Sequence, residues 1–269
     1  MRYEPHDYQV YAAEYIKQHD VAAVLLECGL GKTSITLTAI NDLMFDSFEI
    51  HKVLVIAPIR VAKMSWPDEI EKWDHISDLR YSVAVGTESE RIKALETSAD
   101  IYLINRENVQ WLVEKSGLPF DYDMVVVDEL SSFKNWQAKR FKALMKVRPR
   151  VKRVVGLTGT PSSNGLMDLF AEYKVLDMGQ RLGRFIGQYR KRYGRAWKRI
   201  RDKYVMEHPF CELCFQRGVI VPVEEVHHKK PLSEGGTHDR SNLIALCKSC
   251  HSRIHAERGD RWGKHPEGE

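Results

Sequence analysis

The sequence predicts an α/β protein in which a parallel-sheet domain is followed by a small, zinc-stapled domain. Two observations predict this order. Over the first 180 residues, short apolar runs alternate with helical patterns, which is typical of a parallel sheet with helices on both faces. Beyond residue 210 the chain carries two C-x-x-C pairs, a spacing that indicates metal binding in a chain without a secretion signal. We place the boundary between residues 1–193 and residues 194–269.

Six apolar runs in the first domain have the composition of buried strands. Each is short, rich in β-branched residues and almost continuously apolar, as expected where both faces of a sheet are covered. The runs are VAAVLLEC (21–28), KVLVIAP (52–58), YSVAV (81–85), DIYLIN (100–105), DMVVVDE (123–129) and RVVGLTGT (153–160). Helical patterns such as SITLTAINDLMF, WPDEIEKW and ERIKALE lie between them. The alternation predicts strand–helix–strand units.

Composition and charge narrow the class of protein. The 269 residues are 43% hydrophobic and 29% charged, an ordinary globular composition. No apolar run approaches the roughly 18 residues that span a membrane, and the first residues lack the apolar core of a signal peptide. We therefore expect a cytoplasmic protein with no membrane partner. The oligomeric state stays open.

The charge is unevenly distributed along the chain. Residues 181–269 hold 19 Lys and Arg against 11 Asp and Glu, whereas residues 1–180 hold 22 against 26. A basic segment of this kind favours binding to a polyanion such as DNA; the alternative is a soluble surface that happens to be basic. Within the segment, RAWKRIRDKYVMEHP (195–209) has helical spacing of apolar residues and predicts a basic amphipathic helix.

The stretch LLECGLGKTS (25–34) has the features of a phosphate-binding loop, because it follows an apolar strand and opens a helix. Backbone N–H groups of Gly29, Leu30 and Gly31 can surround a phosphate, Lys32 can reach the terminal phosphates, and the Thr33 hydroxyl can hold Mg²⁺. The full G-x-x-x-x-G-K-T pattern fails at one position, where Leu26 replaces the first glycine. The alternative is a chance GKT in a turn.

A second run supplies the acidic partner that such a loop needs. The strand pattern in MVVVDELSS (124–132) ends in Asp128, which can ligate Mg²⁺ directly or through water. Glu129 follows and can orient an attacking water. An Asp-Glu pair after a strand can also be an ordinary helix cap, but together with GLGKT it indicates a site for ATP with Mg²⁺.

These motifs together resemble a known family. ECGLGKT, VVVDELSSFKN and GLTGTPSSNGLMDLF occur in the order found in the first RecA-like lobe of superfamily II helicases, and look closest to the Swi/Snf-like branch found in phages. The resemblance covers roughly residues 3–192. It implies that Gln9 contacts adenine, that Lys32, Thr33, Asp128 and Glu129 form the ATP site, and that Thr158, Gly159 and Thr160 couple nucleotide to nucleic acid.

One departure from this family bears on activity. The helicases carry a second lobe that supplies arginine fingers to ATP, and the expected second lobe does not follow here. Loss of an arginine finger costs about 10³–10⁵ in rate. We therefore expect ATP binding with poor hydrolysis.

The run from Lys134 to Arg153 holds nine basic residues and no acid. Its basic side chains either line a path for DNA or form a solvated helix face.

The two C-x-x-C pairs predict a structural zinc site. Cys211 and Cys214 precede Cys247 and Cys250 by 32 intervening residues, and four thiolates suit a closed tetrahedral Zn²⁺. Cysteines alone saturate such a site, so the nearby histidines stay available for other chemistry. The alternative is a zinc ribbon in which the histidines are incidental.

The histidines form a second set. His251 and His255 are four residues apart and share a helix face, whereas the adjacent His227 and His228 point to opposite faces if they lie on a strand. His227, His251 and His255 can therefore meet around one metal, with one of the adjacent pair as ligand and the other as base. We expect His238 to be an incidental surface histidine.

Residues 211–258 resemble the HNH endonucleases, the ββα-metal nucleases, through CELC…EEVHHKKPLSEGGTHDRSNLIALCKSCHSRIHAERG. The resemblance implies that His228 is the general base, that Asn242 braces its loop, and that His227, His251 and His255 hold the catalytic cation. Of His251 and His255, either alone can complete the ligand set, with His251 preferred. Many members carry Asp at the position of His227, which leaves the choice of Mg²⁺ or Mn²⁺ open.

We therefore predict a metal-dependent DNA endonuclease attached to an ATP-binding, helicase-like lobe, with weak sequence preference. Two alternatives stand beside it. One is a DNA-dependent ATPase whose C-terminal zinc module only binds DNA, so that a change at Lys32 abolishes function and a change at His228 does not. The other is a non-catalytic DNA-binding protein. The target site, and the choice between nicking and double-strand cleavage, stay open.

Overall fold

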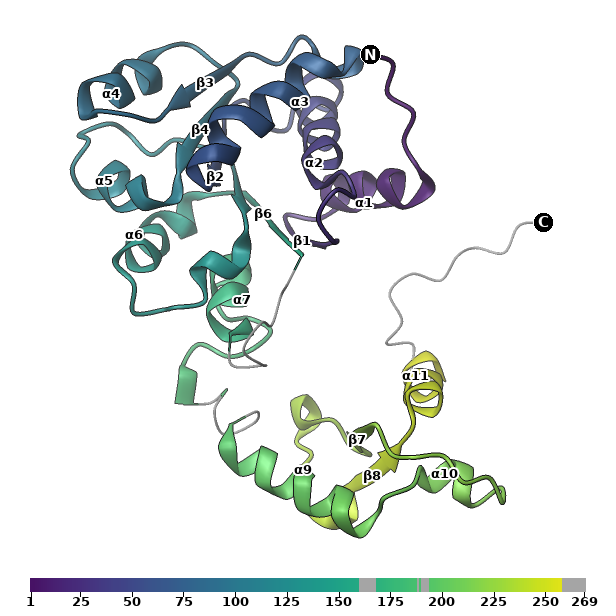
Figure 1. Ribbon diagram of the computed structural model, residues 1–269. Helices are drawn as coiled ribbons and strands as arrows, with labels where there is room; N and C mark the ends of the chain where they lie inside the picture. The colour runs from purple at the N-terminus through teal and green to yellow at the C-terminus, as the bar shows by residue number, and fades with distance from the viewer. Residues whose placement is uncertain (160–167, 188, 190–193, 258–269) are drawn as a thin grey trace. The chain divides into compact units, whose positions relative to one another are not determined.

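A computed structural model of the chain describes residues 1–159, 168–187, 189 and 194–257. The chain divides into two compact units, residues 1–186 and residues 187–269 (Figure 1). The predicted boundary at 193/194 lies seven residues beyond this division and stays a prediction. Among the described residues, no helix is both long and apolar enough to cross a lipid bilayer.

The first unit is built on a six-stranded, wholly parallel sheet in the order β1-β6-β5-β2-β4-β3. All six predicted strands are present, so the expectation of a parallel α/β fold is confirmed. They are β1 (Val21–Leu25), β2 (Val53–Ala57), β3 (Tyr81–Ala84), β4 (Ile101–Asn105), β5 (Met124–Asp128) and β6 (Arg153–Thr158).

Helices follow the strands along the chain. In the first unit these are α1 (Asp7–Gln18), α2 (Lys32–Asn41), α3 (Trp66–Lys72), α4 (Glu88–Glu96), α5 (Val109–Glu114), α6 (Lys139–Val147) and α7 (Leu169–Asp177). The predicted helix that contains SITLTAINDLMF changes character within its length, because α2 ends at Asn41 and Asp42–Asp46 continue as a π-helix. The α4 helix begins at a capping box in which Thr87 accepts a hydrogen bond from the N–H of Glu90, at 3.4 Å.

The sheet is buried on both faces. The α1, α2 and α3 helices pack on one face, and α5, α6 and α7 pack on the other (Figure 1). The strand period of two divides β2 between these layers: Val53 and Val55 face the first, whereas Leu54 and Ile56 face the second. All four side chains are fully buried, which explains why the strands are continuously apolar rather than alternating.

The parallel arrangement fixes where a ligand site can form. Every strand of this sheet ends at the same edge, and helices lead away from that edge. The segments after β1, β5 and β6 therefore meet there, since β6 lies between the other two strands. Open parallel sheets bind ligands at this carboxyl edge.

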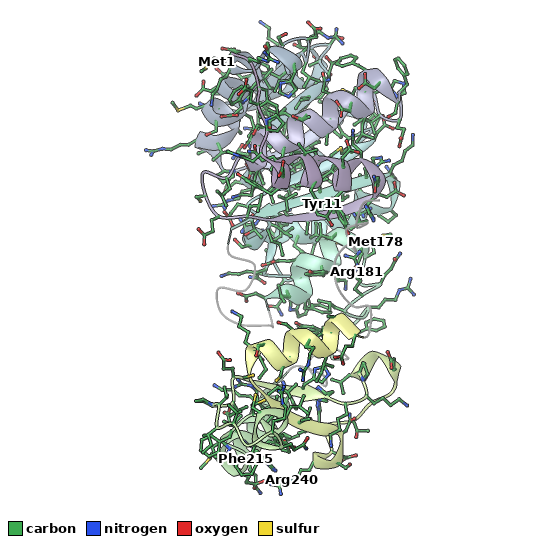
Figure 2. The ribbon with its side chains drawn as sticks, turned by 90° about the vertical axis from the view of Figure 1, so that its right-hand side faces the viewer. Met1, Tyr11, Met178, Arg181, Phe215 and Arg240 are labelled. Atoms are coloured by element: carbon green, nitrogen blue, oxygen red, sulfur yellow. The ribbon has the colours of Figure 1, made fainter. Side chains whose placement is uncertain are left out.

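In the described part of the second unit, a two-stranded antiparallel sheet packs with the helices α9, α10 and α11. Its elements are α9 (Arg195–Glu207), α10 (Glu212–Phe215), β7 (Glu225–His228), β8 (Leu243–Leu246) and α11 (Lys248–Glu257). As predicted, α9 is amphipathic, and it packs Trp197, Ile200, Tyr204 and Val205 against β7 and β8. In Figure 2 the side chains of Phe215 and Arg240 lie at the end of this unit away from α11.

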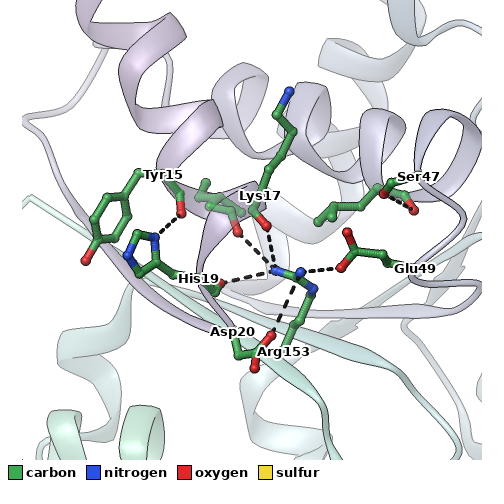
Figure 3. A network of polar contacts seen from close by, with 9 residues as sticks. Tyr15, Lys17, His19, Asp20, Ser47, Glu49 and Arg153 are labelled. Atoms are coloured by element: carbon green, nitrogen blue, oxygen red, sulfur yellow. Dashed lines mark hydrogen bonds and ion pairs between the residues drawn. The ribbon is translucent and has the colours of Figure 1, made fainter.

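A buried arginine ties the first helix of the sheet domain to its sheet. Arg153 opens β6, and its Nη1 lies 3.1–3.3 Å from the carbonyl oxygens of Ile16, Lys17 and His19, at the end of α1 (Figure 3). Its Nη2 donates to the Glu49 carboxylate and lowers the pKa of that group. One guanidinium thus satisfies helix-end carbonyls that have no partner within the helix.

Replacement of Arg153 by leucine is expected to destabilise the protein by about 3 kcal/mol, because it leaves buried carbonyl groups without a donor. In a domain of this size the loss lowers the melting temperature by roughly 6–12 °C. Thermal unfolding of the full chain, followed by circular dichroism, measures it. The exposed Arg150, three residues away, provides the control: Arg150→Leu is expected to shift stability by less than about 0.5 kcal/mol. Equal melting temperatures for the two variants would contradict this role.

Candidate functional sites

Four buried thiols converge in the second unit. The Sγ atoms of Cys211, Cys214, Cys247 and Cys250 all lie within 4.8 Å of one another. Cys214 Sγ is 3.8 Å from Cys247 Sγ and 3.6 Å from Cys250 Sγ, far beyond a disulfide bond. A tetrahedral Zn²⁺ with Zn–S bonds of about 2.3 Å separates its sulfurs by roughly 3.8 Å. The cluster is a four-cysteine metal site with the spacing that zinc requires.

Local elements hold these thiols in place. Cys211 is the N-cap residue of the short helix α10. Its N–H donates to Val221 O, so the chain after CELC folds back on the first cysteine. Cys247 lies between β8 and α11, so the second pair spans a strand-to-helix junction. The Arg217 guanidinium donates to Cys214 Sγ at 3.7 Å and to Cys250 Sγ at 3.4 Å. Burial raises the pKa of both thiols, and the positive group on their sulfurs acts against this effect.

Three histidines, one on β7 and two on α11, form a second cluster. One nitrogen from each of His227, His251 and His255 lies within 4.8 Å of the others. Nε2 of His251 is 3.2 Å from Nε2 of His255, one turn later on α11, near the roughly 3.4 Å that separates two ligands of a tetrahedral metal. His227 is 7% exposed. The three imidazoles fit a divalent cation, and both His251 and His255 are in place to bind it.

His228 has different surroundings from its neighbour. The β7 pleat turns it away from the three-histidine cluster, and its ring lies 4.5 Å from the Trp197 ring of α9. Its Nε2 is 2.9 Å from Nδ1 of His238. Burial, and second the nearby His238, lower the pKa of His228 to about 4. The imidazole is therefore neutral at physiological pH, the form that can accept a proton.

Asn242 braces the loop between β7 and β8. Its Oδ1 accepts from the N–H of Lys230 at 2.8 Å, and its Nδ2 donates to the carbonyls of Lys230 and Thr237 at 3.0 and 2.8 Å. The loop folds back closely, since a Cβ at Gly236 would come within 2.0 Å of Lys230 O. Only glycine is compatible with that approach.

One expectation from the sequence is wrong. His238 is not an incidental surface histidine, because it is hydrogen-bonded to His228 and stacked on Trp197 with ring centroids 4.7 Å apart. Its neighbours in sequence, Thr237 and Asp239, are polar, and this polar context suggested a surface position. Both neighbours are indeed exposed in the structure. The contact depends on the path of the loop after β7 and joins residues ten positions apart, which no local pattern encodes.

The phosphate loop has the predicted place and form. It follows β1, its glycines Gly29 and Gly31 have φ of 84° and 75°, and α2 begins at Lys32. Lys32 Nζ donates to the carbonyls of Leu26 and Glu27 at 2.7 and 2.9 Å. Thr33 lies in the first turn of α2, where the N–H groups and the helix dipole favour an anion.

Gln9 lies directly against this loop. It is buried on α1, and its Oε1 accepts from the N–H of His6 at 2.9 Å. Its Nε2 is so near the loop that a Cβ at Gly31 would come within 2.3 Å of it. Gly31 therefore serves two purposes: it adopts a positive φ and it leaves room for Gln9.

The acidic pair lies at the same edge of the sheet, at the end of β5. Asp128 Oδ2 accepts from the indole Nε1–H of the fully buried Trp66, at 2.9 Å. Burial raises the pKa of Asp128, and this hydrogen bond partly offsets the effect. No sequence pattern predicts this contact, because it joins a helix to a strand end 62 residues away.

Glu129 adopts a backbone conformation that is unusual for a non-glycine residue, with φ of 61°. Such strain concentrates at functional sites. Its Oε1 accepts from the hydroxyls of Ser131 and of Thr158, the latter at 3.1 Å. Thr158 ends β6, so this bond joins the acidic pair to the third motif of the resemblance. Thr160, from the same motif, lies outside the described residues.

Comparisons with known proteins match the two units to two domain families. Residues 13–184 match the SNF2-related domain, and residues 211–257 match the HNH endonuclease domain. Protein p41 of Acyrthosiphon pisum secondary endosymbiont phage 1 is 35% identical over 211 residues, which cover 74% of this chain and 46% of p41. The human DNA annealing helicase and endonuclease ZRANB3 is 28% identical over 183 residues, 67% of this chain and 16% of that protein. The chain spans less than half the length of these relatives.

Solved structures show the same fold. The SWI2/SNF2 ATPase core of Sulfolobus solfataricus in complex with double-stranded DNA superposes with a TM-score of 0.62 at 24% identity, over 73% of this chain and 40% of that one. The same organism's SWI2/SNF2 ATPase core domain superposes with a TM-score of 0.59 at 23% identity, over 86% of this chain and 46% of the other.

Replacement of Cys250 by serine is expected to remove one equivalent of tightly bound zinc, because three thiolates and a hydroxyl no longer saturate the ion. Elemental analysis of the full chain, after dialysis against a chelator that strips open sites, measures it. The control is Cys28→Ser, the same change at the exposed fifth cysteine, which should keep its zinc. Retention of a full equivalent by Cys250→Ser would show that the cluster does not hold the metal.

Proposed function

The chain belongs to the SNF2-related domain family and carries an HNH endonuclease domain, and from this premise we propose that it is a metal-dependent DNA endonuclease with an attached ATP-binding lobe. The HNH domain, with 194–269 as its extent, hydrolyses phosphodiester bonds. The SNF2-related lobe, residues 1–193, binds ATP with Mg²⁺. Since a phage protein is among its relatives, we place the reaction on DNA in a host cytoplasm.

The observation that carries this proposal is that the adjacent histidines of β7, His227 and His228, have different surroundings. His227 faces two further imidazole nitrogens within 4.8 Å, a set that suits a metal. His228, the next residue, makes its hydrogen bond to another histidine instead. A zinc ribbon with incidental histidines has no need of either arrangement.

We assign the general base to His228. Because the imidazole is neutral, it can take a proton from a water molecule as the water oxygen attacks the scissile phosphorus and a P–O bond of the DNA backbone breaks. Asn242 holds the loop that follows His228, through its bonds to Lys230 and Thr237. It therefore fixes the position of the base without touching DNA.

We assign the catalytic cation to His227, His251 and His255. When bound, the cation stabilises negative charge on the phosphate and on the leaving oxygen. Three neutral imidazoles bring no negative charge to the site, and nitrogen donors suit transition-metal dications better than Mg²⁺, which prefers oxygen. We therefore favour Mn²⁺ over Mg²⁺ as the activating ion.

The basic face of α9 supplies contacts to the DNA backbone. Lys198, Arg199 and Lys203 are exposed, on the helix whose opposite face packs against β7 and β8. Phosphate contacts of this kind position a protein without sequence recognition. This agrees with the weak sequence preference that we expect.

In the SNF2-related lobe we assign phosphate binding to Gly29, Gly31 and Lys32, and Mg²⁺ binding to Thr33 and Asp128. Gln9 contacts adenine, since it lies against the phosphate loop. Glu129, held by Thr158 and Ser131, orients the attacking water if hydrolysis occurs. We propose that this lobe binds ATP but hydrolyses it poorly without arginine fingers.

Wild-type protein with Mn²⁺ or Mg²⁺ is expected to convert supercoiled plasmid to nicked or linear product. His228→Ala should lower the cleavage rate by roughly 10²–10⁴, the usual contribution of a general base. The control is His208→Ala, the same change at a histidine in the same unit that stacks on Tyr204 outside both clusters. This variant should cleave normally.

If zinc-loaded wild-type protein leaves the plasmid intact with either metal, or if His228→Ala cleaves as fast as wild type, the nuclease assignment fails. The alternative then stands, in which the zinc module only binds DNA and the activity belongs to the ATP site.

Lys32→Ala is expected to weaken ATP binding by at least about tenfold, or 1.4 kcal/mol, because it removes the cation that reaches the terminal phosphates. Titration of a fluorescent ATP analogue, followed by anisotropy, measures the change. Lys115→Ala serves as the control, since Lys115 is exposed and lies at the end of α5, away from the carboxyl edge. Equal affinities for the two variants would remove the phosphate loop from the ATP site.

A further inference from the structure

A second histidine, outside the three-histidine cluster, touches the proposed base. Nδ1 of His238 is 2.9 Å from Nε2 of His228, and the two ring centroids are 5.1 Å apart at an interplanar angle of 50°. Both rings are only partly exposed. Among the described residues this is the one hydrogen bond of the His228 side chain. Nothing in the proposed function so far uses His238.

Trp197 holds both rings from one side. Its indole stacks on His238, with centroids 4.7 Å apart and an interplanar angle of 21°, and it contacts His228 at 4.5 Å and 36°. Trp197 itself lies on the apolar face of α9, which packs against β7 and β8 together with Ile200 and the buried Tyr204. Since the indole is anchored, its two contacts restrict the orientation of both imidazoles.

Hydrogen bonds on both sides of His238 hold the loop that carries it. Asn242 Nδ2 donates to the carbonyl of Thr237, the residue before His238, at 2.8 Å. On the other side, the N–H of Asp239 donates to Thr237 Oγ1 at 3.3 Å. The close approach of Gly236 to Lys230 O brings the two limbs of the loop together. Hydrogen bonds therefore hold the backbone on both sides of His238, and Asn242 links Thr237 to Lys230, two residues after His228.

The contact between two imidazoles has a chemical consequence. One of the two facing nitrogens must carry a proton and the other a lone pair. If Nε2 of His228 donates, Nδ1 of His228 keeps its lone pair and can accept a proton from water. The opposite arrangement places the proton of neutral His228 on Nδ1, which then cannot serve as a base.

We propose that His238, clamped by Trp197, is a positioning residue for the nuclease reaction: it accepts a hydrogen bond from Nε2–H of His228 and so keeps Nδ1 of His228 as the basic nitrogen. The role rests on the proposed function of His228 as general base. His238 touches neither DNA nor the cation in this role, and acts only through the tautomer and orientation of the base.

The test compares His238→Ala and His238→Asn with wild type, in the full zinc-loaded chain. His238→Ala should lower the single-turnover rate of plasmid nicking by roughly 10- to 100-fold, the usual cost of losing a residue that orients a functional histidine. Its affinity for the plasmid should stay within about twofold, since no contact to DNA is removed. His238→Asn should recover a large part of the rate, because the asparagine carbonyl can accept a hydrogen bond near the position of the histidine Nδ1.

A second readout needs no activity. Nuclear magnetic resonance of protein labelled with ¹⁵N-histidine distinguishes the two tautomers, and the His228→Ala spectrum identifies the His228 signals. Wild type should show His228 protonated on Nε2, His238→Ala should show a mixture, and His238→Asn should restore the Nε2–H form. Zinc content confirms that each variant is folded.

The outcomes separate this proposal from the one on which it rests. If His228→Ala nicks plasmid as fast as wild type, the general base is elsewhere and both proposals fail. If His228→Ala is inactive but His238→Ala keeps the wild-type rate and tautomer, only the positioning role fails. A wild-type His228 that carries its proton on Nδ1 also overturns it.

Discussion

The second unit depends on the convergence of four thiols. Its secondary structure, from α9 to α11, runs over residues 195–257, a size at which a core alone stabilises a fold only marginally.

The cysteine cluster also positions the histidines of α11. Cys247 and Cys250 fix the start of α11, and this helix then carries His251 and His255 toward β7. The pair Cys211 and Cys214 lies at α10. Glu212, between these two cysteines, accepts a hydrogen bond from the N–H of Ala245 on β8 at 2.8 Å, so α10 is joined to the sheet. His251 and His255, two of the three proposed cation ligands, thus inherit their positions from the cysteines.

In the first unit the corresponding constraint is the parallel sheet. Because all strands end at one edge, three segments far apart in sequence meet without any long loop: the phosphate loop after β1, the acidic pair after β5 and Thr158 at the end of β6. The hydrogen bond between Thr158 and Glu129 crosses between adjacent strands. A change at one motif can therefore reach the next through a single side-chain contact.

Sequence patterns predicted the parts of this structure that have a local cause. The six strands follow from continuous apolar runs, and the phosphate loop follows from glycines with a helix behind them. The opposite orientations of His227 and His228 follow from the two-residue period of a strand, and the shared face of His251 and His255 follows from the helical period.

The contacts that the sequence did not predict are non-local. Trp66 reaches Asp128 across 62 positions, and Arg153 reaches the end of α1 across more than 130. His238 meets His228 only because of the detailed path of a loop. Periodicity carries no information about any of these.

The two adjacent histidines show how surroundings, rather than residue type, divide the roles at a site. A metal ligand and a general base both need a neutral imidazole, so composition cannot distinguish them. The pleat places His227 against two further imidazole nitrogens, where a bound cation would offset the mutual repulsion of three lone pairs. The same pleat places His228 against Trp197 and His238, where burial keeps it neutral and a hydrogen bond occupies one of its two nitrogens. A one-residue shift in the register of β7 would bring Val226 or Lys229 into one of the two environments and move one histidine into the other, so one of the two proposed roles would be lost. The register is set by Glu225–His228 pairing with Leu243–Leu246, and β8 leads directly into Cys247. In the proposed function, the cluster that stabilises the unit therefore also determines which histidine serves as the base.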